Sequence, residues 1–493
     1  MVNGNLAYKI QPEIIEEINP LAPDPLKYTS VALSEVFSNN TRLEASAFNL
    51  EAKAAKYKVE HCRYGYVHLW GKDGLVKDAY YGNRAKRDYV SKNTSGAIGF
   101  IGSSEMLYVN PKPYKFISPN IKKTDGFKAP IGSVLISRSG TIGNVTLVNK
   151  TLSKLLISEH AIRIIPTDFG GYIYAFLKTN TGKTLVKANT FGAVVDEIEP
   201  EHLKNIIIPN APELIKRKIH NLIVESYDLR DQSNELMEEA ERILYEELQL
   251  PPIEQLKPKY FDESVDLRNY TTKLSGLNLR LDCSYHTPET ATILNIIHST
   301  AKEVKRIGDK EISDKIILAG RFKRTYVDDR NGIPFFGGKQ LLELSPSNIK
   351  YLSKDQHGSR ITKELYLKEN MVAVTCSGTI GKVNIIPRHW ENWALNQHVM
   401  RIVPATKDIA GYIYCWLNTD YAYQLIVRNT YGAVVDEIDD RHLSQVEIPL
   451  LKNESKQKEI NDKVLEANEL RYQAYLKEQE AIAKMDDVIN NLK

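Results

Sequence analysis

Two acidic pairs, each followed six positions later by a histidine, are the residues of this chain that could most simply support metal-dependent chemistry. The two sets are Asp196-Glu197 with His202, and Asp436-Glu437 with His442. Carboxylate and imidazole ligands can hold a divalent cation, and such a site would predict a nuclease. The structural alternative is that the carboxylates cap a turn while the histidine packs at the start of the next strand. We favour the structural interpretation, because a motif without structural context is a weak indication of a site.

Other signatures of catalysis are missing from the sequence. No phosphate-binding G-x-x-x-x-G-K-[ST] loop occurs, and no Asn/Asp-Pro-Pro-aromatic tetrapeptide of the DNA methyltransferase kind is found. His160 and His398 fall in apolar strands, where a satisfied imidazole is the expected role. The sequence therefore predicts a chain without catalytic residues, metal or cofactor of its own. Two alternatives stay open: a self-contained nuclease using Asp196 and Asp436, and a scaffold without sequence specificity.

Binding to phosphates is the chemistry that the glycine-rich turns favour. The pentapeptide Ser-Gly-Thr-Ile-Gly occurs at residues 139–143 and again at 377–381. Its glycines suit a tight hairpin, and its exposed N–H and hydroxyl groups can bond phosphate oxygens. We predict that Ser139, Thr141, Ser377 and Thr379 contact DNA.

Basic residues alternate with aromatic ones upstream of each turn. They are Arg84, Lys86, Arg87, Tyr89 and Lys92 in the first copy, and Arg321, Lys323, Arg324, Tyr326 and Arg330 in the second. Arginine can read guanine edges and lysine can neutralise phosphates, so this pattern predicts a nucleic-acid surface. A solvated loop is the alternative for any single residue, but recurrence in both copies favours function.

An internal duplication is the strongest signal in the chain. The Ser-Gly-Thr-Ile-Gly turn recurs at an offset of 238, and Glu159-His160 recurs as Gln397-His398 at the same offset. The Gly-Ala-Val-Val-Asp-Glu-Ile run at residues 192–198 recurs at 432–438. Between these anchors the copies diverge, and residues 73–81 show no clear counterpart. A common frame with different loops suits the reading of two different short DNA sequences.

Each copy is followed by a segment with a heptad pattern, which predicts two long helices packed as an antiparallel coiled coil. The first helix is predicted over residues 213–248, about 54 Å at ~1.5 Å per residue. Its small positions are Ile219, Ser226, Ser233 and Ala240. The seam positions that we assign to partner contact are Ile215, Leu222, Leu229, Leu236 and Ile243 in the first helix, and Ile460, Ala467, Ala474, Ala481 and Val488 in the second.

Mixed short strands and helices predict an α/β (α+β) fold for both copies. Each Ser-Gly-Thr-Ile-Gly turn is expected to join two strands, and residues 171–188 are expected to form one helix. The predicted organisation is an N-terminal arm (1–27), a first module (28–212), the first long helix (213–250), a proline-containing linker (251–267), a second module (268–452) and the second long helix (453–493).

Composition and charge limit the class of protein further. The 493 residues carry a net charge of +3, but residues 225–247 hold nine acidic and two basic side chains, which leaves +10 on the rest. Anions are therefore expected to bind the modules rather than the first helix. No window of ~18 apolar residues occurs, and four cysteines without a C-x-x-C pair indicate a reduced, cytoplasmic protein.

The order of these motifs resembles the DNA-specificity subunit of type I restriction–modification systems, over residues 26–493. The resemblance implies two target recognition domains and two antiparallel helices that act as spacer and docking surface. It implies double-stranded DNA, two methyltransferase subunits and a restriction/translocase subunit as partners. S-adenosylmethionine, ATP and Mg²⁺ would bind those partner subunits, which would methylate adenine at N6 and cut DNA. The implied target has two half-sites with an unspecified gap, and exchange of residues 43–200 is expected to change only one of them.

Overall fold

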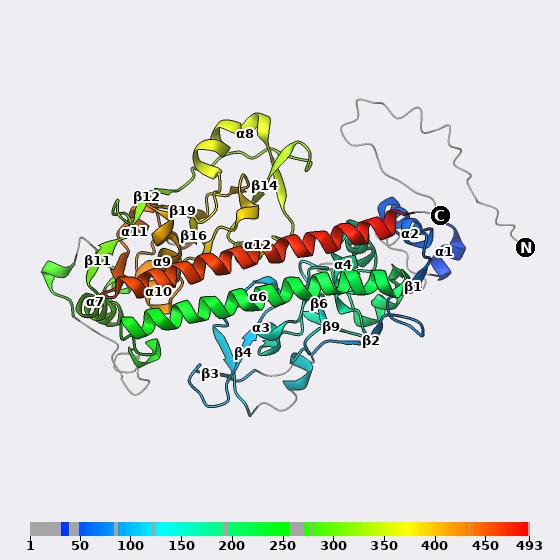
Figure 1. Cartoon of the computed structure of the whole chain (residues 1–493), viewed down its shortest axis with the longest axis horizontal. Helices are drawn as coiled ribbons and strands as arrows, with labels where there is room; N and C mark the ends of the chain where they lie inside the picture. The colour runs from blue at the N-terminus through cyan, green and yellow to red at the C-terminus, as the bar shows by residue number, and fades with distance from the viewer. Residues whose placement is uncertain are drawn as a thin grey trace, which may run out of the picture.

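The computed structural model describes residues 31–38, 49–82, 87–120, 124–190, 196–256, 271–277, 280–432 and 434–491. Two long helices run side by side through the middle of the molecule, and the two modules lie on opposite sides of the pair (Figure 1). No helix within these described ranges is long and apolar enough to cross a membrane. The predicted N-terminal arm, residues 1–27, lies outside the described ranges.

The long helices begin and end where the sequence places its helix signals. Helix α6 spans Glu213–Glu247, and α12 spans Glu454–Asn490. Pro212 precedes α6, and Gln249 adopts a left-handed backbone with φ of 50° just after its end. Asn453 caps α12 by accepting a hydrogen bond from the backbone of its first turn. The prediction of a first helix over residues 213–248 is confirmed to within one residue.

The two helices are antiparallel, as predicted. Residues progressively later in α6 contact residues progressively earlier in α12. The pairs are Glu225 with Lys477 at 2.8 Å, Ser233 with Arg471 at 2.9 Å, and Glu239 with Lys463 at 2.8 Å.

Small residues, rather than the large apolar ones, form the tightest part of the seam. Ser226, Ser233 and Ala240 of α6 and the alanines of α12 (Ala467, Ala474 and Ala481) are all 0 % exposed, as is the larger Ile219 in the same register of α6. Ser226 donates a hydrogen bond of 2.7 Å to the Ala474 carbonyl. Leu222, Ile243, Ile460 and Val488 are also buried, whereas Ile215, Leu229 and Leu236 are only half-buried. Short side chains let the helix backbones approach closely.

The described strands of the first module form three sheets. A two-stranded sheet pairs β1 (Tyr66–His68) with β10 (Ile207–Pro209). A four-stranded sheet has the order β2 (Val76–Tyr80), β9 (Ala161–Pro166), β6 (Val134–Ser137) and β7 (Val145–Leu147). A second four-stranded sheet has the order β3 (Tyr89–Val90), β5 (Lys115–Ile117), β4 (Ile98–Ile101) and β8 (Leu156–Ile157).

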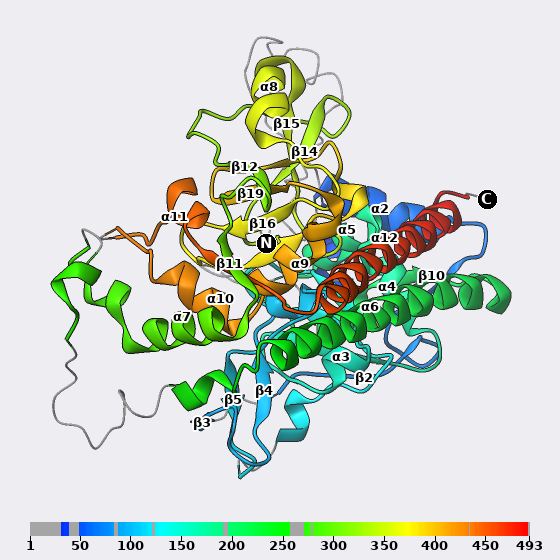
Figure 2. The same cartoon turned by 60° about the vertical axis from the view of Figure 1, so that its left-hand side comes forward.

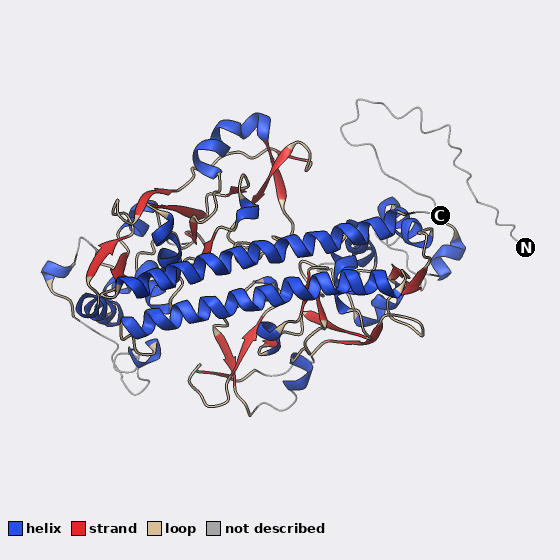
Figure 3. Cartoon of the chain, viewed as in Figure 1, coloured by secondary structure: helices blue, strands red, loops and turns tan. Residues whose placement is uncertain are grey.

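The second module repeats this topology strand for strand. Its two-stranded sheet pairs β11 (Glu303–Arg306) with β20 (Glu447–Leu450). One four-stranded sheet has the order β12 (Ser313–Ile317), β19 (Val399–Pro404), β16 (Val372–Thr375) and β17 (Val383–Ile385). The other has the order β13 (Tyr326–Val327), β15 (Lys350–Ser353), β14 (Gly332–Phe336) and β18 (Ala394–Leu395). The strands lie on both sides of the helix pair (Figure 3). The duplication is thus structural, and β2 and β12 occupy the same place. Residues 73–81, which have no clear counterpart in sequence, therefore include a strand with a counterpart in structure: β2 and β12 share a backbone position without sharing a sequence.

The helix predicted over residues 171–188 is also wrong in its extent, because it is two helices. Helix α4 spans Gly170–Lys178 and α5 spans Asn180–Ala188. Thr179 between them is extended, and its side chain caps α5 by accepting from the backbone N–H of Gly182 at 3.0 Å. The same break separates α9 (Lys407–Leu417) from α10 (Asp420–Val427) at Thr419.

Shorter helices complete each module. They are α1 (Leu33–Ser38), α2 (Leu50–Glu60) and α3 (Lys150–Ser153) in the first, and α7 (Pro288–Thr300), α8 (Lys354–Arg360) and α11 (Asp440–Ser444) in the second. Figure 2 shows α8 with β14 and β15 projecting from one side of the helix pair, and β3, β4 and β5 projecting from the other.

Each module core includes opposite ends of both long helices. The first core contains Ile223 from the start of α6 and Met485 from the end of α12. The second contains Ile243 from the end of α6 and Val464 from the start of α12. Burial of these apolar side chains therefore fixes the antiparallel arrangement, and the helix pair is continuous with both cores.

The modules also touch each other at the middle of the molecule, although the spacer role implied for the helices predicts modules that are held apart. Tyr108 of the first module and Glu343 of the second form an antiparallel β-bridge. The N–H of Val109 donates to the carbonyl of Leu342 at 3.0 Å. Tyr108 and Glu343 are related by the same offset of 235 as Phe100 and Phe335, which occupy equivalent places in β4 and β14. The bridge thus lies on a pseudo-twofold axis.

Candidate nucleic-acid interface

Both Ser-Gly-Thr-Ile-Gly runs form the predicted hairpin turns, between β6 and β7 and between β16 and β17. Their glycines require left-handed backbone, with φ of 72° at Gly140 and 74° at Gly378. A hydroxyl inside each turn fixes its shape, because Ser137 donates to the Thr141 carbonyl and Thr375 to the Thr379 carbonyl, both at 2.6 Å. The turn conformation leaves the Thr141 and Thr379 side chains exposed.

The turn serines are partly buried and contact neighbouring polar residues. Ser139 Oγ lies 2.7 Å from His160 Nδ1, and Ser377 Oγ donates to Glu437 at 3.3 Å. Of the four hydroxyls predicted to meet phosphate, the two threonines are therefore the better presented. His160 and its counterpart His398 come directly before β9 and β19, rather than inside the strands.

One arginine in each basic segment is held by the residue before that histidine. Arg87 Nη2 lies 2.5 Å from the Glu159 carboxylate, and Arg324 Nη2 donates to the Gln397 amide oxygen at 2.7 Å. Burial disfavours the charged form of Glu159, but its backbone hydrogen bond and Arg87 outweigh that effect and lower its pKa. In both modules the arginine is thus anchored beside the hairpin.

Aromatic rings complete the same cluster in both modules. The Arg87 guanidinium lies 4.7 Å from the Phe100 ring centroid, and that of Arg324 lies 5.4 Å from the Phe335 centroid. Each arginine also approaches a tyrosine hydroxyl, Tyr89 at 3.4 Å and Tyr326 at 3.5 Å.

A lysine covers the tyrosine in each case. Lys115 lies 5.7 Å from the Tyr89 ring centroid, and Lys350 lies 4.9 Å from that of Tyr326. The sequence motifs did not single out these lysines or the two phenylalanines. Their equivalence at an offset of 235 was the available signal, but the strands that carry them have few residues in common.

Of the other predicted basic residues, those that the structure describes are not gathered with this cluster. Arg84 and Lys86 lie outside the described ranges. Lys92, Lys323 and Arg330 are exposed, as is Arg321, whose guanidinium pairs with Glu437 at 3.0 Å. An exposed ion pair of this kind stabilises the fold little.

A cleft of about 450 Å³ in the second module brings four of the predicted residues together. Arg324, Tyr326, Ser377 and Thr379 line it, with Lys339, Lys350, Lys382 and His398. Among the described residues of its wall, four are permanent cations and none is acidic. Burial and then the charge of Arg324 lower the pKa of His398, which disfavours a further positive charge at neutral pH. The cleft therefore suits a polyanion.

The histidines of the two candidate metal sets have a structural role. Asp439 accepts from the His442 N–H at 2.9 Å and the His442 ring caps the Asp439 backbone in return; Glu199 and His202 form the equivalent capping box. Asp196 and Asp436 are exposed. Over the described part of the chain, no three His, Cys, Asp or Glu side chains are grouped closely enough to hold a metal ion.

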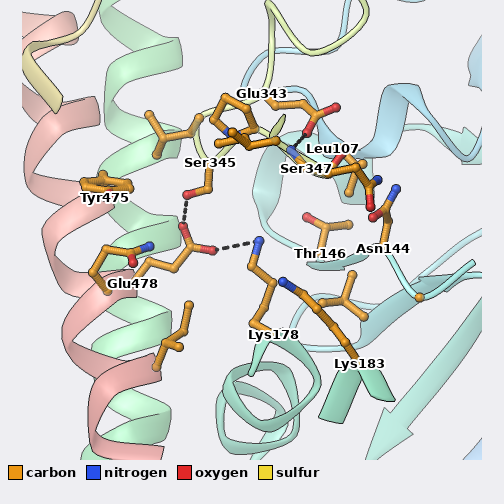
Figure 4. Close-up of a pocket in the computed structure, with 18 of the residues that line it drawn as sticks. Leu107, Asn144, Thr146, Lys178, Lys183, Glu343, Ser345, Ser347, Tyr475 and Glu478 are labelled. Carbon is orange, nitrogen blue, oxygen red and sulfur yellow. Dashed lines mark hydrogen bonds and ion pairs between the residues drawn. The ribbon is translucent and has the colours of Figure 1, made fainter. Parts of the chain in front are cut away.

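A second cavity, of about 470 Å³, lies where both modules meet both long helices (Figure 4). The Glu478 carboxylate of α12 lies beside it and is 0 % exposed. It pairs with Arg230 of α6 at 2.9 Å and with Lys178 of the first module at 3.5 Å, and accepts from Ser345 of the second module at 2.5 Å. Tyr174 of α4 donates a further hydrogen bond to it. One buried charge thus joins four parts of the fold.

A family model described as "Type I restriction modification DNA specificity domain" matches residues 311–468, which cover most of the second module and the first part of α12. The matched segment is thus similar to the DNA specificity domain of type I restriction–modification systems. The first module, over which the family model does not extend, repeats the sheets of the second module in the same order.

Three solved structures are similar to this chain at low sequence identity. A type I restriction–modification S subunit from M. genitalium is 12% identical, with a TM-score of 0.32, and the match covers 87% of this chain and 96% of that one. The HsdS subunit from Thermoanaerobacter tengcongensis is 15% identical, with a TM-score of 0.26, covering 87% and 97%. A structure from work on complex assembly and conformational transition of the type I R-M system is 15% identical, with a TM-score of 0.27, covering 87% and 98%. No curated protein sequence matches the chain.

Proposed function

We propose that each module reads one half of a bipartite duplex target. The observation that supports this most is the matched cluster of arginine, tyrosine, phenylalanine and lysine that lies beside the glycine hairpin in both modules. Arginine held by an aromatic face and a polar side chain is presented in a fixed orientation, which base recognition requires. The differing loops around a shared frame give the two modules different sequence preferences.

The helix pair sets the spacing between the half-sites. The 35 residues of α6 span about 52 Å at ~1.5 Å per residue. One turn of duplex is about 34 Å long, so two modules at opposite ends of the pair can meet successive major grooves. The bases between the half-sites are then spanned without being read.

Chemistry belongs to partner subunits in this proposal. Two methyltransferase subunits and a restriction/translocase subunit bind this cytoplasmic chain, which directs them to the target sequence. S-adenosylmethionine, ATP and Mg²⁺ bind to those partners. The long helices, whose seam is already buried by mutual packing, offer their outer faces as the docking surface.

The test of the DNA-reading proposal is the substitution Arg324→Ala in the full chain. We expect affinity for the cognate duplex to fall roughly 10- to 100-fold, and discrimination at one base of the second half-site to relax. Lys458→Ala removes one exposed cation from the outer face of α12 and is the matched control. The target is identified from methylated adenines in the host genome, and binding is measured by fluorescence anisotropy between 50 and 200 mM salt. An equal loss in both variants, or affinity independent of salt, would contradict the proposal.

A further inference from the structure

Lys382 of the second module is held by a residue of the first. It follows the glycine turn of the second hairpin, and its ammonium donates a hydrogen bond of 2.9 Å to the Tyr108 hydroxyl. The same ammonium lies 5.1 Å from the centroid of the Tyr108 ring. The two residues are 274 positions apart in the chain, so this contact depends on the arrangement of the two modules.

The position of Tyr108 is fixed by the bridge between the modules. Tyr108 pairs with Glu343, and the adjacent Val109 is buried with Leu344 and Ala474 in a small apolar cluster over α12. The backbone hydrogen bond of Val109 tightens the same contact. Because both the backbone and the neighbouring side chain are anchored, the Tyr108 ring reaches Lys382 from a rigid base.

Lys382 lines the cationic cleft of the second module. Thr379 and Ser377 of the hairpin and Lys350 line the same cleft. A phenol hydroxyl, unlike a carboxylate, does not offset the charge of the ammonium that it contacts, while the contact restricts the conformations of the Lys382 side chain. A fixed ammonium beside hairpin hydroxyls is an arrangement that binds a backbone phosphate.

The first module lacks this arrangement. At the offset of 238 that relates the hairpins, the counterpart of Lys382 is Asn144. The counterpart of Tyr108 across the pseudo-twofold axis is Glu343, which cannot supply a ring. A tyrosine of the first module therefore contacts the cleft of the second module, whereas the equivalent position of the second module offers no ring to the first hairpin.

We propose that the second-module cleft is a composite phosphate site, completed by Tyr108 of the first module. Tyr108 is a positioning residue: it orients Lys382 toward a backbone phosphate of the half-site that the second module reads. This inference rests on the proposed DNA-reading function, and it makes the two modules unequal, since binding at one half-site depends on both of them.

The experiment compares Tyr108→Phe, Lys382→Met and the double variant in the full chain. Tyr108→Phe removes the hydroxyl and keeps the ring, while Tyr114→Phe removes a hydroxyl from an exposed tyrosine of the same module as a control. Each protein is titrated against two duplexes, one with only the first half-site intact and one with only the second. Thermal unfolding curves show whether the variants remain folded.

Lys382→Met is expected to weaken binding to the second half-site about tenfold and to reduce its salt slope by about one. Tyr108→Phe is expected to cause a roughly three- to tenfold loss at the same half-site, with no further loss when combined with Lys382→Met. The first half-site should be unaffected. Additive losses, equal losses at both half-sites, or no loss in Tyr108→Phe would overturn the composite site. If the wild-type chain does not discriminate between duplexes at all, the proposed function itself fails.

Discussion

At the scale of single residues, Glu159 and Gln397 hold equivalent arginines but leave them with different charges. The carboxylate of Glu159 neutralises Arg87, and the lowered pKa of Glu159 keeps that carboxylate ionised at neutral pH. Gln397 offers only an amide oxygen to Arg324, so the second arginine keeps its full positive charge. The salt dependence of the two half-sites should therefore differ.

The reciprocal substitutions Glu159→Gln and Gln397→Glu test this difference. Glu159→Gln should strengthen phosphate attraction at the first half-site, with affinity rising roughly three- to tenfold and the salt slope growing by about one. Gln397→Glu should have the opposite effect at the second half-site. Binding is measured on duplexes that contain one half-site each. If Glu159→Gln lowers affinity instead, the carboxylate orients Arg87 for base reading and its charge is not the deciding property.

The sequence identifies a site residue when its role depends on a local motif, and does not when its role depends on a contact with a distant part of the chain. Arg324 and Thr379 are predicted from motifs that recur in both modules, and both of them line the cleft of the second module. Lys350 was missed because it begins a short strand without a recognisable pattern, and Lys382 because it lies just outside the repeated turn motif and has Asn144 as its counterpart. The role of Tyr108 depends on a contact with the other module, which no local pattern in the sequence expresses.

At the scale of elements, the heptad pattern predicted the helix pair but not its full environment. The seam was found because its period is regular. Tyr227, Arg230 and Asn234 are also buried, on a second face of α6 that packs against the modules. Polar residues on that face gave no apolar signal, although Asn234 donates to the Val109 carbonyl at 2.9 Å and so supports the bridge. The break at Thr179 was missed for a related reason, since a cap formed by one side chain interrupts an otherwise helical pattern.

Glu478 provides the sharpest test of the helix pair. Burial disfavours its charged form, but Lys178 and Arg230 outweigh that effect and lower its pKa to about 2. Glu478→Gln leaves those two cations without their counter-charge, and should reduce the free energy of unfolding by about 3–5 kcal/mol. Glu480→Gln on an exposed position of the same helix is the control and should change it by less than about 0.5 kcal/mol. Urea unfolding at pH 7 measures both variants.

The contribution of Glu478 to stability is expected to change with pH in one direction. Because the folded-state pKa of Glu478 lies below the ordinary value of 4.5, its stabilising effect is present above pH 4.5 and is lost as the pH falls toward 2. The difference in stability between wild type and Glu478→Gln should therefore narrow over that interval. A constant difference across it would show that Glu478 acts through shape and hydrogen bonding alone.

At the scale of the whole molecule, the pseudo-twofold axis relates two modules that are similar but not independent. The symmetry could be predicted from the duplication, because every sheet of one module recurs in the other. The contact between the modules could not, because the residues on the axis, Tyr108 and Glu343, are equivalent in position and unlike in chemistry. Exchange of residues 43–200, which the sequence predicts to alter one half-site only, also exchanges Tyr108.

Two chimeras that exchange the first module distinguish its reading of the first half-site from its contact with Lys382 in the second module. Both replace residues 43–200 with the corresponding module of a type I restriction–modification specificity subunit, and one of them retains Tyr108 and Val109 at the bridge. Each should change the sequence read at the first half-site and leave that of the second unaltered. The exchange without Tyr108 should in addition bind the second half-site about three- to tenfold more weakly, because Lys382 loses its neutral partner. Methylated motifs in a host carrying each chimera report the sequences, and titration with single half-site duplexes reports the affinities. Equal second-site affinity in both chimeras would show that the bridge joins the modules without tuning the cleft.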